Sequence, residues 1–140
     1  MTLEDLPSWA AELLRYERVA RLAYLDGRGR PRVLPVTFGL AEGRVWSAID
    51  EKPKRSPEPA RVRALRARPE AALCVDHYSD DWSNLCWVQL LGRVEIAAVA
   101  ERTAAVEALA AKYPQYSERT PPGPLLGLSV ERALSWRAAD

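Results

Sequence analysis

The sequence from residue 45 to residue 55 reads Val45-Trp46-Ser47-Ala48-Ile49-Asp50-Glu51-Lys52-Pro53-Lys54-Arg55. Its first six residues alternate between two faces, with Val45, Ser47 and Ile49 on one of them, and this period of two predicts a β-strand. Pro53 has no N–H to donate to a sheet, so the strand must end before it. The stretch therefore predicts a strand that runs directly into a loop.

That loop is strongly cationic and leads into a helix. Its positive residues are Lys52, Lys54 and Arg55. Ser56 is suited to N-cap a helix predicted over 57–68, and proline at the first helical position fits the same start. A strand, a loop with two lysines and a helix N-terminus together suit an anion such as a phosphate. The alternative is a solvated basic loop, because runs of charge are usually exposed.

Composition limits the class of protein. The chain has 140 residues, 48% of them hydrophobic and 28% charged, with a net charge of +1. This predicts one domain, 1–140, that does not bind nucleic acid as its main activity, since such domains are usually strongly basic. No apolar run approaches the roughly 20 residues of a membrane span, and the acidic N-terminus is unlike a signal peptide. We therefore expect a cytoplasmic protein without a membrane partner.

Cysteine and histidine are too scarce for a disulfide framework or a metal site. The chain has two cysteines, Cys74 and Cys86, and one histidine, His77. We expect no metal, because a site of several histidines is impossible. A hairpin centred near Asp80 would place the two cysteines roughly opposite each other. In a reducing cytoplasm we interpret them as buried thiols, and a disulfide between them is the alternative.

Periodicity predicts a mainly β protein with few helices. Strands are expected over 19–25, 32–40, 45–50, 71–78, 85–96 and 125–136, and helices over 9–16, 57–68 and 101–112. In the second helix, Val62 and Leu65 should face inward and the arginines, Arg61 among them, outward. Gly92 suggests a bulge in the fifth strand. Short connections favour antiparallel pairing, so we expect a six-stranded antiparallel barrel.

Three segments resemble a known family. They are Asp50 to Arg55, the run Asp76-His77-Tyr78-Ser79-Asp80-Asp81-Trp82, and Ala111-Lys112-Tyr113-Pro114-Gln115-Tyr116. From about Arg18 to Trp136 the chain resembles pyridoxamine 5'-phosphate oxidase-like proteins, the FMN-binding split barrels. Within them it is similar to an actinobacterial subgroup, the F420-dependent oxidoreductases.

The resemblance implies a six-stranded split barrel that forms a homodimer, with cofactor bound in clefts between the two barrels. It implies a cofactor phosphate held by Lys52 and Lys54, with Arg55 and Ser56 as neighbours. The cofactor ring and ribityl chain would be lined by Val36, Thr37, Ser47 and Ile49. The side chains expected to face the ring or the partner subunit are His77, Tyr78, Trp82 and Trp87.

The implied function is transfer of a hydride between coenzyme F420 and a small conjugated organic acceptor. A deazaflavin performs the difficult step itself, so the protein need only bind it, orient it and exclude water. No catalytic side chain is identified; His77 is a candidate proton donor, or a strand-end histidine bonded to a neighbouring aspartate. The alternatives are an FMN-dependent enzyme of the same fold, a non-catalytic F420 or haem binding protein, and nucleic-acid binding through the arginine-rich helix.

Overall fold

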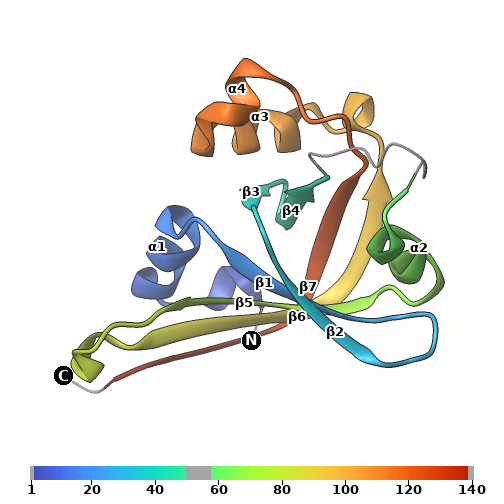
Figure 1. The fold of residues 1–140 in the computed structure, drawn as a ribbon. Helices are drawn as coiled ribbons and strands as arrows, with labels where there is room; N and C mark the ends of the chain where they lie inside the picture. Colours follow the sequence, from blue (N-terminus) through green and yellow to red (C-terminus); the bar gives the residue numbers. More distant parts are fainter. Residues whose placement is uncertain (1, 50–57, 139–140) are drawn as a thin grey trace.

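One antiparallel sheet dominates the computed structural model, which describes residues 2–49 and 58–138 (Figure 1). Its strands are β1 Ala20–Leu25, β2 Pro31–Val36, β3 Gly39–Ala41, β4 Arg44–Ala48, β5 Glu70–His77, β6 Cys86–Ala97 and β7 Leu125–Arg137. The α-helices are α1 Ser8–Tyr16, α2 Ala60–Ala67, α3 Thr103–Lys112 and α4 Pro114–Glu118. Short 3-10 turns are η1 Leu3–Asp5, η2 Trp82–Asn84 and η3 Val99–Glu101. No helix in these two ranges is long and apolar enough to cross a membrane.

The strand order forces the sheet to curl. The order is β2-β1-β5-β6-β7-β4-β3, so β2 and β3 are its two edges. Yet only Thr37 and Phe38 separate these strands along the chain, and the three steps from Val36 to Gly39 span at most about 11 Å. The opposite edges of the sheet are therefore brought together at this corner, as in a split barrel. Figure 1 shows β5, β6 and β7 continuing beyond the barrel as three long neighbouring strands.

The mainly β, antiparallel class is confirmed, but the expected number of six strands is wrong. The sheet has seven strands, because the strand predicted over 32–40 is interrupted at Thr37 and Phe38. There the Thr37 hydroxyl lies 2.8 Å from the Tyr116 hydroxyl, and the Phe38 N–H donates to the Tyr113 hydroxyl at 3.1 Å. The tyrosines take the place of a strand partner, so the chain leaves one edge and joins the other.

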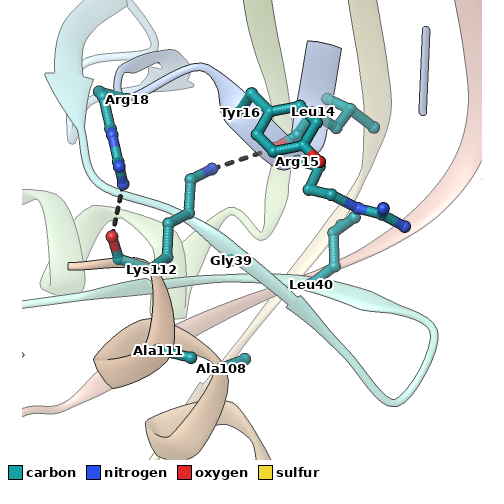
Figure 2. A pocket seen from close by; sticks show the side chains of 9 residues that line it. All are labelled: Leu14, Arg15, Tyr16, Arg18, Gly39, Leu40, Ala108, Ala111 and Lys112. Atoms are coloured by element: carbon teal, nitrogen blue, oxygen red, sulfur yellow. Dashed lines mark hydrogen bonds between the residues drawn. The ribbon is translucent and has the colours of Figure 1, made fainter. Parts of the chain in front are cut away.

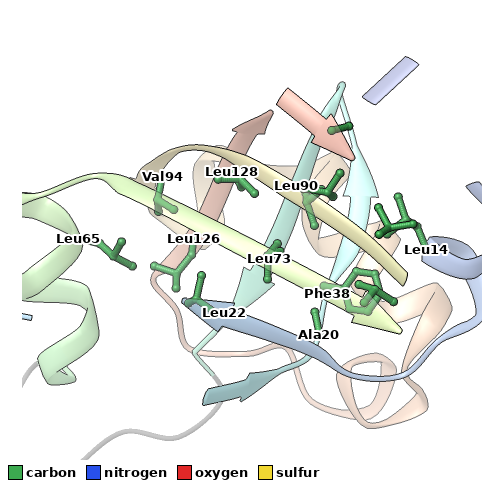
Figure 3. Close-up of a cluster of buried hydrophobic side chains, with 14 of the residues drawn as sticks. Leu14, Ala20, Leu22, Phe38, Leu65, Leu73, Leu90, Val94, Leu126 and Leu128 are labelled. Atoms are coloured by element: carbon green, nitrogen blue, oxygen red, sulfur yellow. The ribbon is translucent and has the colours of Figure 1, made fainter. Parts of the chain in front are cut away.

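The strand predicted from the alternation after Val45 is confirmed as β4, and the structure buries it on both faces. Val45 and Ile49 belong to a first core cluster between the sheet, α1 and α2, and Trp46 and Ala48 belong to a second cluster under α3 and α4. Figure 3 shows the first cluster, with Leu65 at one end and Leu14 and Phe38 at the other. The second cluster consists of Trp46, Ala48, Ala97, Ala105, Leu109, Tyr113, Tyr116 and Leu125.

The predicted bulge at Gly92 is confirmed. The pairing of β6 with β7 shifts register between Leu91 and Gly92. A Cβ at position 92 would lie 1.8 Å from the Ser129 carbonyl oxygen, so only glycine allows the two strands this close.

The expected placement of the cysteines opposite each other is wrong. Cys74 pairs with Gln89, and Cys86 pairs with His77. The turn of the β5–β6 hairpin is centred one to two residues after Asp80. Because moving the centre of a hairpin shifts each cross-strand partner by twice that amount, Cys74 lies opposite Gln89, three positions after Cys86. Both thiols are free, and partial burial raises the pKa of each.

Candidate functional site

A small cavity opens where the end of β2 approaches β4 and α2. Its volume is about 230 Å³. It is lined by Val19, Pro35, Val36, Thr37, Ala48 and Arg61. Three separate parts of the fold thus meet here: the β2–β3 corner, the buried strand β4, and the first turn of α2. We refer to it below as the β2–β4–α2 cavity.

Arg61 gives this cavity its charge. Its Nε is buried and has no hydrogen-bond partner within the part of the chain that the structure describes. The Oγ of Ser47, which neighbours Ala48 in β4, is likewise buried and unpartnered there. Buried polar groups are normally hydrogen-bonded, and an unsatisfied charged donor is costly. An arginine in this state beside a cavity is therefore suited to an anionic ligand.

Helix α2 explains how Arg61 reaches the cavity. Val62 and Leu65 face the core, at 0% and 1% exposure, as predicted. Arg63, Arg66 and Arg68 are exposed, but the prediction that Arg61 also faces outward is wrong, because Arg61 is half-buried. It precedes Leu65 by one helical turn, so it lies on the flank of the apolar stripe rather than opposite it. This spacing was the signal in the sequence that could have identified Arg61.

The predicted cationic loop comes between two cavity residues, Ala48 and Arg61, in the sequence. Lys52, Lys54, Arg55 and Ser56, predicted to hold a phosphate, lie outside the described residues. They occupy the segment 50–57, which follows β4 and leads toward α2. Their role as phosphate ligands therefore stays a prediction.

The residues predicted to line the cofactor ring fall into two groups. Val36 and Thr37 line the β2–β4–α2 cavity, although the Thr37 hydroxyl is already bonded to Tyr116. Ser47 and Ile49 flank the cavity residue Ala48 along β4, but Ile49 is 2% exposed and packs in the first core cluster. Its N–H donates to the Pro124 carbonyl at 3.2 Å.

A second cavity holds His77 and Tyr78. Its volume is about 400 Å³, and Val19 lines both this cavity and the first. The His77 Nδ1 lies 3.8 Å from Glu17 Oε2, a distance at which a protonated imidazole and a carboxylate attract. The remaining lining residues include Tyr16, Arg18, Arg21 and Asp76. His77 is thus placed next to the proposed cofactor cavity rather than inside it.

The two predicted tryptophans are separated. Trp87 lines a further cavity of about 340 Å³ that also contains His77, Tyr78 and Trp136. Trp82 lies in η2, between β5 and β6, and its side chain is 68% exposed. Trp87 and His77 therefore line the same cavity, whereas the Trp82 side chain is exposed on the surface of this chain.

Carboxylates, thiols and the imidazole do not assemble into a metal site in 2–49 or 58–138. No group of three or more such side chains is positioned to hold an ion there.

Solved structures of similar fold differ in what they bind. A FAD-binding protein of Mesorhizobium loti has a TM-score of 0.70 at 18% identity, with 99% of this chain and 98% of that chain covered. A heme storage protein of Vibrio cholerae has a TM-score of 0.71 at 12% identity, with 94% of each chain covered. An F420 reductase has a TM-score of 0.67 at 17% identity, with 92% of this chain and 98% of that chain covered. At these identities the likeness shows the fold alone.

The family is shown by comparison of the sequence with family models rather than by the similar solved structures. No curated protein matches this chain. The family model for pyridoxamine 5'-phosphate oxidase, however, matches residues 6–137. That match covers nearly the whole chain, including the β2–β4–α2 cavity and the His77 strand end. The chain therefore belongs to the pyridoxamine 5'-phosphate oxidase family.

Proposed function

We propose that this protein is an oxidoreductase that transfers a hydride between coenzyme F420 and a small conjugated organic acceptor. The observation that carries the proposal is the half-buried Arg61, which lines the β2–β4–α2 cavity and whose buried Nε has no hydrogen-bond partner among the described residues. Along the chain, the segment 50–57, which contains Lys52 and Lys54, comes between Ala48 and Arg61, and both of these residues line the cavity. FMN is the alternative cofactor, because the same cationic groups would accept its phosphate equally well.

The chain's own groups are suited to binding and orienting such a cofactor. The Arg61 guanidinium supplies a fixed donor for an anionic group, and Lys52 and Lys54, with Arg55 and Ser56 beside them, would add charge from the adjoining loop. Strand β2 is a sheet edge, so part of its backbone is free to bond a planar ring near Val36. When bound, the cofactor supplies the hydride.

His77 is the candidate proton donor of this proposal. Its cavity and the cofactor cavity share Val19, so an acceptor could lie between the imidazole and the cofactor. Glu17, whose Oε2 lies 3.8 Å from the His77 Nδ1, would help to orient the imidazole. His77→Gln should therefore lower turnover more than it weakens cofactor binding.

A homodimer completes the proposed site. On the face of β5, β6 and β7 that points away from the first core cluster, Asp76, Trp87 and Trp136 are cross-strand neighbours. Trp136 is 45% exposed, and Tyr78, at the end of the same hairpin, is 70% exposed. Aromatic side chains of this kind are enriched at protein interfaces. A second subunit on this face would cover the cavities that hold His77 and Trp87.

Cofactor titrations test the proposal directly. Purified protein is titrated with F420 and with FMN, following cofactor fluorescence, and the dissociation constants are compared. We expect Arg61→Gln to weaken F420 binding by about tenfold or more, the loss of one charge-assisted hydrogen bond. The matched control is Arg63→Gln, which removes an exposed arginine two residues away on the same helix. Lys54→Ala should likewise weaken binding by more than about tenfold.

Several outcomes would contradict parts of the proposal. Equal affinity of the Arg61→Gln and Arg63→Gln proteins would remove Arg61 from the site. Tight haem binding, seen as a Soret band, without F420 or FMN binding would replace the proposal with a haem-binding function. Bound F420H2 that no acceptor oxidises would indicate a non-catalytic binding protein. A monomer in sedimentation velocity would refute the proposed dimer.

A further inference from the structure

A larger cavity lies between α1, β3 and α3, on a part of the fold that the proposed cofactor site does not use (Figure 2). Its volume is about 510 Å³. The lining residues are Leu14, Arg15, Tyr16, Arg18, Gly39, Leu40, Ala108, Ala111 and Lys112. It shares none of these residues with the β2–β4–α2 cavity. We call it the α1–α3 cavity.

Small residues create this space. Gly39 in β3 approaches α3 so closely that a Cβ there would lie 3.4 Å from Leu109 Cδ2. Ala108 and Ala111 present only methyl groups from α3, while Leu14 and Leu40 add larger apolar surfaces. One side of the cavity is therefore apolar and able to receive a hydrocarbon group.

The other side of the cavity is positive, and Lys112 is fixed there. Its Nζ donates to the Leu14 carbonyl at 3.0 Å and lies 3.5 Å from the centre of the Phe38 ring. Arg18 in turn donates a hydrogen bond to the Lys112 carbonyl. Figure 2 shows the two hydrogen bonds, from Lys112 to Leu14 and from Arg18 to Lys112. These contacts hold the amine at the end of α1, so little conformational entropy remains to be lost when a ligand binds.

Among the described residues, this positive side of the cavity has no ion pair, although Glu17 lies near enough to act on Lys112. In the described ranges, none of Arg15, Arg18 and Lys112 forms an ion pair with a carboxylate. The neighbouring cavity is different, because its Arg21 is paired with Asp76 at 2.8 Å. Burial, together with the charge of Arg18, lowers the pKa of Lys112 to about 8, while Glu17 opposes this shift. A half-buried ammonium without a counter-ion is what a bound anion would satisfy.

We propose that the α1–α3 cavity binds an organic carboxylate with an apolar body. The carboxylate would be held by Lys112 and Arg18, with Arg15 at the exposed rim. The apolar body would lie against Leu14 and Leu40. An inorganic anion would satisfy only the positive side of the cavity, and a neutral molecule only the apolar side. The inference does not rest on cofactor binding at the β2–β4–α2 cavity, with which the α1–α3 cavity shares no residue. Tyr16 and Arg18 line both the α1–α3 cavity and the His77 cavity.

Calorimetric titration of the full-length protein with benzoate tests this inference. Benzamide is the neutral control of the same shape, and inorganic phosphate is the control that lacks an apolar body. Benzoate should bind at least about tenfold more tightly than either, because only benzoate engages both sides. Equal affinity for benzoate and benzamide would overturn the proposal.

Two variants locate the binding. Lys112→Met keeps the apolar stem over Phe38 and removes the charge, and it should weaken benzoate binding by about tenfold or more. Arg15→Gln changes an exposed side chain at the rim of the cavity and should weaken benzoate binding several-fold. If Lys112→Met does not fold, the affinity of the Arg15→Gln protein decides the test. Arg63→Gln controls for the loss of a positive charge elsewhere. Unchanged affinity in both folded cavity variants would refute the site.

The pH dependence gives a second readout. The titratable and charged groups near the Lys112 amine are Arg15 and Tyr16 at the end of α1, Glu17 and Arg18 directly after it, and Tyr113 after α3. With its pKa near 8, Lys112 loses its charge as the pH rises from about 7 to about 9.5, so benzoate affinity should fall several-fold over that range. The same fall should be absent in Lys112→Met. A pH-independent affinity in the wild-type protein would contradict the assigned role of Lys112.

Discussion

Replacing Gly127 by alanine should destabilise the protein by forcing Trp46 out of position. The two residues are directly opposite each other in the β4–β7 ladder. A Cβ at position 127 would lie 2.5 Å from Trp46 Cζ3 and 2.7 Å from its Cη2. Carbon atoms in contact prefer about 3.5–4.0 Å, so the indole must move by roughly 1 Å. Because β4 also provides Ala48 to the β2–β4–α2 cavity, this movement would reach the proposed site.

The environment of Trp46 sets the size of the effect. Its side chain is fully buried, its Nε1–H donates to the Ala41 carbonyl at 3.0 Å, and the Arg102 guanidinium lies 5.7 Å from its ring centre. Overpacking a core costs about 1–3 kcal/mol, and leaving a buried donor unpaired costs about 1–3 kcal/mol. We therefore expect Gly127→Ala to lower the free energy of unfolding by about 2–6 kcal/mol.

Urea denaturation followed by tryptophan fluorescence and circular dichroism measures this change. The matched control is Gly27→Ala, at a turn position where a Cβ would meet nothing within 4 Å. It should stay within about 0.5 kcal/mol of the wild type. Adding Trp46→Phe removes part of the obstructing ring, so Gly127→Ala should cost at least about 1 kcal/mol less in that background. A Gly127→Ala protein as stable as the Gly27→Ala control would refute the reasoning.

Two further predictions concern charged groups. The folded protein releases the Lys112 proton near pH 8, whereas an unfolded lysine keeps its proton to about pH 10.5. Between those pH values the unfolded state binds more protons than the folded state. The free energy of unfolding of the wild type should therefore rise with pH relative to that of Lys112→Met. Urea denaturation of both proteins at several pH values measures this difference. Glu95 accepts hydrogen bonds from both Arg44 and Arg102. Glu95→Gln should cost about 1 kcal/mol, measured by urea denaturation at low and high salt, with a smaller difference at high salt.

Local patterns predicted the elements whose burial repeats with a regular period. The alternation from Val45 to Ile49 correctly predicted a strand, and burial of both its faces follows from its place between the two core clusters. The inward positions of α2 and the bulge at Gly92 were also predicted. These features depend on residues close in sequence, whose spacing reflects the helical or strand period directly.

The pairing of distant segments could not be predicted in the same way. The strand expected over 32–40 is divided because Tyr113 and Tyr116, far along the chain, bond to its middle. The cysteine pairing was wrong because hairpin register depends on where the turn is centred, and a small error there changes every cross-strand partner.

The sequence alone determined the antiparallel, mainly β class and the family, and it identified a cationic segment after β4. Tertiary structure decided which charges meet a cavity. Arg61 reads as one more solvated arginine until α2 is packed beside β2 and β4. Lys112 reads as the last residue of an alanine-rich helix until α1 and Phe38 enclose its amine. The period of the apolar residues indicates which face of a helix or strand is buried. Which residues pack against that face depends on contacts between segments that are far apart in the chain.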